Sequence, residues 1–162
     1  MRHQIRTILL LLLLWLRPVE AAQFQDFTED VAWVPTTYNG YDSHQAVYTI
    51  GPIANEVSNA CYIISAQYEI SNIDPHHSIM VGQTIIRTSS LDDFRGVRVT
   101  PATTTNVDRA RHHEHWNGSI VECPPVGVWY YRLVVYSGLR KAIKPAIRVE
   151  QGYGFLQAYR LH

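Results

Sequence analysis

The segment of this chain best suited to chemistry is Arg111-His112-His113-Glu114-His115-Trp116. Alternate side chains of an extended strand point to the same side, so His113 and His115 are expected to share one face. Imidazole nitrogens bind divalent transition metals, and Glu122, which follows His115 by seven residues, could add a carboxylate oxygen. The sequence therefore predicts a candidate metal site of His113, His115 and Glu122. The alternative interpretation is a solvated strand end without any cofactor.

This segment resembles part of the cupin motif, in which a His-x-His pair on a strand is followed by a carboxylate and later by a third His. The resemblance implies a metal-dependent enzyme built on a β-barrel. Here the carboxylate stands further from the pair, and no His follows Pro125-Val126-Gly127 closely. A Gly-x-Ser-x-Gly elbow and a metalloprotease His-Glu-x-x-His are both absent from the sequence. A non-enzymatic function is therefore favoured, and the question of an enzyme stays open.

A second constellation, Tyr38-Asn39-Gly40-Tyr41-Asp42-Ser43, is typical of recognition loops. Tyrosine supplies rigid amphipathic area, and Asn, Gly and Ser supply adaptable hydrogen bonds. Asn-Gly is also the strongest short hairpin signal, so a simple turn is the alternative. The ligand-binding residues predicted for this module are Tyr38, Asn39, Tyr41, Asp42 and Trp116.

Two further segments are similar to parts of the DM9 repeat. Trp33-Val34-Pro35 with the Gly40–Ser43 stretch resembles the opening of that repeat, and Arg109-Ala110-Arg111-His112 resembles its middle. Some members of that family bind mannose, so the resemblance implies a lectin-like role. The expected partner is accordingly an extracellular protein or a carbohydrate.

The amino terminus has the pattern of a secretory signal peptide. Arg2 and Arg6 precede an apolar run from Ile8 to Leu16, and a small-residue exit, Val19-Glu20-Ala21-Ala22, follows. The run is shorter than the roughly 20 apolar residues that cross a bilayer, and no later run approaches that length. We expect cleavage after residue 22, a single secreted β domain over 23–162, an extracellular location and no membrane span.

Charge argues against nucleic acid as a partner. The predicted leader contains three of the 14 basic and one of the 14 acidic residues, which leaves 11 basic and 13 acidic residues. A slightly negative chain has no electrostatic attraction to phosphate backbones.

Cysteine usage and one sequon fit the same export route. Cys61 and Cys123 are the two cysteines of the chain, and an even pair in an oxidising compartment is expected to form a disulfide. Asn117-Gly118-Ser119 is an acceptor sequence for N-glycosylation, which predicts a glycoprotein with Asn117 on the surface.

The elements that must position these residues are strands. Residues alternate between apolar and polar from Cys61 to Ile70, and aromatic and β-branched residues predominate from Val128 to Tyr136. Turn signals such as Asn39-Gly40, Asp74-Pro75 and Pro124-Pro125 separate the runs. This pattern predicts an all-β, antiparallel β-sandwich, with a β-barrel or jelly roll as the alternative. A barrel would allow a third function, that of a carrier for a small apolar molecule.

Overall fold

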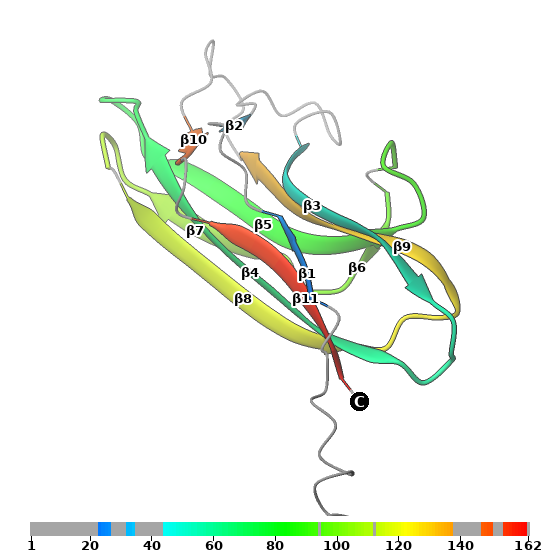
Figure 1. Cartoon of the computed structure of the whole chain (residues 1–162). Helices are drawn as coiled ribbons and strands as arrows, with labels where there is room; N and C mark the ends of the chain where they lie inside the picture. The colour runs from blue at the N-terminus through cyan, green and yellow to red at the C-terminus, as the bar shows by residue number, and fades with distance from the viewer. Residues whose placement is uncertain are drawn as a thin grey trace, which may run out of the picture.

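Two antiparallel β-sheets packed face to face form the protein in its computed structural model (Figure 1). The structure describes residues 23–26, 32–34, 44–93, 95–111, 113–137, 147–150 and 154–161. Its strands are β1 (Gln23–Asp26), β2 (Ala32–Val34), β3 (His44–Asn55), β4 (Cys61–Asn72), β5 (Ile79–Thr88), β6 (Val97–Arg98), β7 (Thr103–Val107), β8 (Glu114–Glu122), β9 (Gly127–Ser137), β10 (Ile147–Val149) and β11 (Phe155–Leu161).

The strand order is that of a jelly roll. One sheet, called sheet A here, has the order β1-β11-β4-β8, with the short strands β10 and β2 continuing beyond the end of β11. Sheet B has the order β3-β9-β5-β7, and β6 pairs with β5 further along the same edge. The chain passes from one sheet to the other between β2 and β3, β3 and β4, β4 and β5, β7 and β8, β8 and β9, and β9 and β10, which is the double-sheet jelly-roll pattern. The predicted all-β sandwich is confirmed.

The core lies between the two sheets and follows the alternation of the sequence. On β4 the side chains of Tyr62, Ile64, Ala66, Tyr68 and Ile70 are all buried and face inward. The opposite sheet contributes several inward side chains of β9, namely Tyr131, Leu133 and Val135. Full burial of a large apolar side chain contributes about 1.5–3 kcal/mol, so these two central strands supply much of the stability.

The predicted disulfide is confirmed. Cys61, the first residue of β4, is bonded to Cys123, which directly follows β8. Since the two cysteines are 62 residues apart, the crosslink restricts a long loop of the unfolded chain. The chain-entropy model gives about 4 kcal/mol for a loop of this length. The bond also fixes one end of the β4–β8 pair.

Candidate functional site

His113 and His115 meet at a buried carboxylate, that of Glu69. Glu69 lies on β4 and its side chain is 2% exposed, whereas the two imidazoles are 61% and 63% exposed. His115 is the cross-strand neighbour of Glu69, and its Nδ1 lies 4.0 Å from Glu69 Oε2. His113 precedes β8 with a left-handed φ of 65°, and its Nδ1 contacts Glu69 Oε1. The two histidines are therefore brought together by one carboxylate.

A second acidic residue, Glu150, is hydrogen-bonded to Glu69 through the backbone. The backbone N–H of Glu150 donates to the Glu69 carbonyl at 2.8 Å, and Arg148 donates from Nε and Nη2 to Glu150 Oε1 at 3.0 and 2.8 Å. Burial by itself raises the pKa of Glu150, but hydrogen bonds from Ser71 and Arg148 outweigh it and the pKa is lowered. Glu69, His113, His115, Arg148 and Glu150 form what we call the carboxylate cluster, which joins the ends of β4, β8 and β10.

The third predicted metal ligand lies elsewhere. Glu122 is at the opposite end of β8 from His115, and a strand rises about 3.4 Å per residue, so the two residues are separated by about 24 Å. Their positions also differ by an odd number, which places them on opposite faces of the sheet. Within the described residues, no group of three or more His, Cys, Asp or Glu side chains is arranged to hold a metal ion. The structure thus does not bring Glu122 to the His113–His115 pair.

Glu122 instead forms an ion pair between the two sheets. Its Oε1 contacts Nη1 of Arg87 on β5, and the two side chains are only 15% and 10% exposed. The Arg87 guanidinium lies 4.7 Å from the centre of the Trp129 ring, a cation–π distance. Burial, and then the nearby Glu122 carboxylate, raise the pKa of Tyr131 above its ordinary value. The Arg87–Glu122 ion pair, together with Trp129 and Tyr131, stabilises the end of the sandwich at which the disulfide lies.

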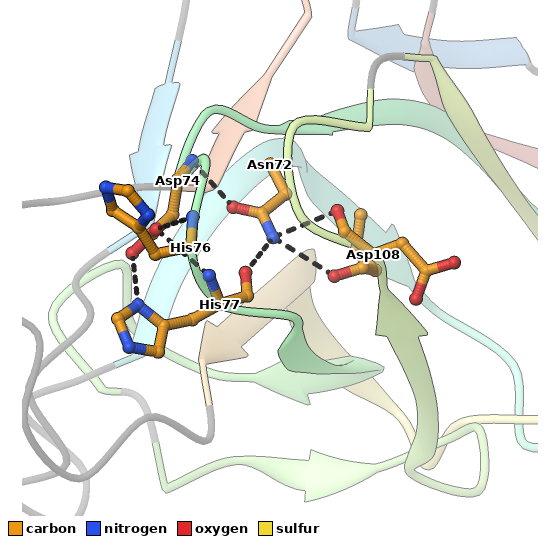
Figure 2. A network of polar contacts seen from close by, with 6 residues as sticks. Asn72, Asp74, His76, His77 and Asp108 are labelled. Carbon is orange, nitrogen blue, oxygen red and sulfur yellow. Dashed lines mark hydrogen bonds and ion pairs between the residues drawn. The ribbon is translucent and has the colours of Figure 1, made fainter.

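A polar network joins two loops at the other end (Figure 2). Asn72 is the last residue of β4. Its Nδ2 donates to the carbonyls of His77, Val107 and Asp108 at 2.9, 3.1 and 3.1 Å. Its Oδ1 accepts the N–H of Asp74 at 3.0 Å. The loop after β4 and the loop after β7 are therefore held by one buried amide.

The adjacent turn is closed by the Asp74 carboxylate (Figure 2). The N–H of His76 donates to Oδ1 at 2.7 Å, and His77 Nδ1 lies 3.1 Å from Oδ2. These two contacts, in that order, lower the pKa of Asp74. The arrangement is that of an Asx turn, which is a structural role.

Trp116 points into the sandwich. Its ring packs against the core with its centre 5.4 Å from that of Tyr68, and its Nε1 donates to Thr103 Oγ1 on β7 at 3.2 Å. Gly118 leaves room for this indole, because a Cβ there would lie 2.7 Å from a Trp116 ring carbon. The other predicted ligand residues, Tyr38, Asn39, Tyr41 and Asp42, lie outside the described residues. The structure thus gives Trp116 a packing role between β8 and β7.

The outer face of sheet A carries a patch without charge. We call it the amide–aromatic face, and it comprises Ile63, Ser65 and Gln67 on β4 and Phe155, Gln157 and Tyr159 on β11. The strand register places these residues in three direct pairs, Gln67–Phe155, Ser65–Gln157 and Ile63–Tyr159. All six are exposed or half-buried, and the Tyr159 hydroxyl donates to Gln157 Oε1 at 3.0 Å.

Asn117, the predicted glycosylation residue, borders this face. It lies in the middle of β8, is exposed, and pairs across the strands with Gln67. Ser119, the last residue of the sequon, is also exposed, and its hydroxyl is 3.0 Å from the Ser65 hydroxyl. The surface position that the sequon predicts for Asn117 is thus what the structure shows, while the modification itself stays a prediction.

The sequence contained signals for part of this site. The alternation from Cys61 to Ile70 places Gln67 and Glu69 on the polar side of one strand, but only strand pairing reveals that Glu69 meets two histidines. The residues of β11 alternate as well, since Phe155, Gln157 and Tyr159 have a period of two. The pairing of β11 with β4 could not be predicted from the sequence, because 88 residues separate Gln67 from Phe155.

Comparison with known proteins yields a structural likeness alone. No family model matches the sequence, and no curated protein matches it. The solved structure described as "Structure of Eiger TNF from S. frugiperda" is similar, with a TM-score of 0.48 and 15% sequence identity over 90% of this chain and 94% of that chain. No helix able to cross a bilayer is found in the described part of the chain. By its own strand order and crosslink the protein is a disulfide-bonded, all-β sandwich with jelly-roll strand order.

Proposed function

We propose that this protein is a secreted, non-enzymatic binding module that recognises an extracellular protein through the amide–aromatic face. The observation that carries the proposal is the composition of that face: two aromatic rings and two amides on adjacent strands, without an ionised side chain. The centres of protein interfaces are enriched in aromatic residues and depleted of Lys, Glu and Asp, since a charge is costly to desolvate. The neighbouring carboxylate cluster would lie at the rim, where charge is tolerated.

The dimensions of the face fit the centre of an interface. Two strands about 4.8 Å apart and five residues long span about 10 Å by 17 Å, or roughly 170 Å². A standard interface takes about 800 Å² from each partner, so the bordering strands and loops would supply the rest. Residues at the centre of an interface contribute most to affinity. We therefore expect the face, rather than its borders, to determine binding.

The structure offers less support for the other two functions considered. An enzyme using His113, His115 and Glu122 would need these residues to converge, and Glu122 is paired with Arg87 instead. A carrier for an apolar molecule would need room between the sheets, where large side chains such as Tyr68 and Tyr131 are packed.

A charge placed on the face tests the proposal. Gln67→Lys puts an ammonium beside Phe155, and burying it unpaired in an interface should weaken binding at least tenfold. Met80→Lys is the matched control, because Met80 is 51% exposed on sheet B. The probes are an array of recombinant extracellular protein domains and a glycan array. Thermal melting verifies that both variants fold.

The expected result is an ectodomain that binds the wild type and Met80→Lys equally and binds Gln67→Lys at least tenfold more weakly. Binding to glycans but to no ectodomain would replace the protein partner with a carbohydrate. Equal binding of Gln67→Lys and the wild type would refute the role of this face.

A further inference from the structure

Strand β8 lies at an edge of sheet A, as far as the described strands go. Among the described strands, β8 pairs with β4 alone, and Figure 1 shows it along the border of the sandwich. It is nine residues long, and one row of its backbone N–H and C=O groups pairs with no strand in the described part of the chain. Exposed edges of this kind are templates for pairing between molecules, and proteins normally interrupt them with charges, proline or a bulge.

The centre of β8 has none of the side-chain devices that block pairing. From Trp116 to Val121 the sequence is Trp-Asn-Gly-Ser-Ile-Val, without Lys, Arg, Asp, Glu or Pro. The register with β4 also runs without a bulge from Glu114 to Glu122. Val121 is 58% exposed, which adds apolar surface at the same edge. Something other than these side chains must protect the strand.

We infer that an N-glycan on Asn117 covers this edge and keeps the protein from self-pairing through β8. Asn117 is the fourth of the nine residues of β8, and its exposed side chain leaves space for a sugar. A glycan is bulky and strongly hydrated, so it would exclude a second strand from both halves of the edge. This inference does not require the partner proposed above, although Asn117 pairs with Gln67 and the glycan would therefore stand at the border of the amide–aromatic face.

The structure also indicates when the glycan is added. In the folded protein the Ser119 hydroxyl, which the acceptor sequence requires, is 3.0 Å from the Ser65 hydroxyl. Residues 117 and 119 are held extended by pairing with Gln67 and Ser65. The sequon is therefore freely available only before β8 joins β4. Transfer would form a bond from Asn117 Nδ2 to the anomeric carbon of a lipid-diphosphate-linked oligosaccharide, as the bond from that carbon to the diphosphate breaks and the amide loses one proton.

The test uses the full chain produced by a eukaryotic secretory cell. We expect the wild type and Ser119→Thr, which keeps the sequon, to carry a glycan that a peptide N-glycosidase removes with conversion of Asn117 to Asp. Asn117→Gln should lack the glycan and sediment as dimers or larger species at concentrations where the wild type is monomeric. Asn117→Lys, also unglycosylated, should remain monomeric, since lysine blocks edge pairing.

Each readout can overturn a separate part of the inference. Wild-type protein that is secreted without a glycan would refute the modification site. A glycosylated wild type together with a folded, monomeric Asn117→Gln would refute the protective role. Self-association of Asn117→Lys to the same degree as Asn117→Gln would show that β8 is not the surface involved. None of these results depends on whether the amide–aromatic face binds a partner.

Discussion

Replacing Asn72 should separate the two loops that its side chain joins, and the size of the effect can be worked out from the structure. The amide nitrogen has two hydrogens, so its contacts with the carbonyls of His77, Val107 and Asp108 amount to two full hydrogen bonds. The bond accepted from Asp74 makes a third. At about 1 kcal/mol for each bond, Asn72→Ala should lower the free energy of unfolding by about 3 kcal/mol.

Asn72→Asp should be more damaging at neutral pH, although it has nearly the same shape. A carboxylate only accepts hydrogen bonds, so it would present an oxygen to three carbonyl oxygens and raise its own pKa in the folded protein. A carboxyl group whose pKa is higher in the folded protein than in the unfolded chain contributes stability below the unfolded pKa of about 3.9. That contribution is lost as the pH rises. At pH 7 the free energy of unfolding of Asn72→Asp should therefore be lower than that of Asn72→Ala, and this difference should be smaller at pH 4.

Urea unfolding of both variants and the wild type at these two pH values measures the effect. Because Asn72→Asp is compared with Asn72→Ala at the same pH, the acid sensitivity of groups remote from residue 72 cancels. If Asn72→Asp and Asn72→Ala were equally stable at pH 7, the three-carbonyl arrangement would not hold in solution. A loss below 1 kcal/mol for Asn72→Ala would show that the loops are held by other contacts.

Three further predictions concern the interior and its crosslink. Glu122→Gln should lower the free energy of unfolding by about 3 kcal/mol, measured with urea, because it leaves the buried Arg87 guanidinium without a counter-charge. Arg87→Met combined with Glu122→Leu should recover most of that loss, and additive single and double effects would disprove the pairing. Burial raises the pKa of Tyr68, so above about pH 10 only the unfolded chain loses this proton and stability should fall with rising pH. Tyr68→Phe should reduce that slope by up to about 1.4 kcal/mol per pH unit, and an unchanged slope would contradict the burial of the phenol. Cys61→Ala with Cys123→Ala should lower the free energy of unfolding by about 4 kcal/mol, and equal denaturation midpoints for this variant and the wild type would exclude a stabilising crosslink.

The fold class could be predicted because its signals are local. Alternation over 61–70 specifies which side chains of β4 enter the core, and the structure buries Tyr62, Ile64 and Tyr68 as that pattern requires. A chain with two cysteines offers one intramolecular pairing, so the disulfide could also be predicted. The order of the strands within each sheet could not be predicted from local patterns, because β3 pairs with β9 and β1 with β11, which are far apart in the sequence.

The site was less predictable because its residues depend on pairing between distant strands. His113 and His115 were identified as neighbours, but the residue that joins them, Glu69, lies on another strand and resembled an ordinary solvent-facing carboxylate. For Glu122 the sequence did contain the relevant information, because its odd spacing from His115 already places it on the other face of β8. Trp116 shows that an aromatic residue beside a polar sequon can still face inward, because Gly118 leaves room for the indole.

The position of β11 has a consequence for biosynthesis. Of the described strands, β11 is the latest in the sequence, and it is inserted between the earliest, β1, and the central strand β4. Sheet A therefore cannot be completed before β11 has been synthesised, and the inner side chains along this side of β4 stay exposed until then. A stop codon before Phe155 would remove the strand that pairs with β1 and expose one edge of β4. We therefore expect the truncated product to be degraded by cellular quality control.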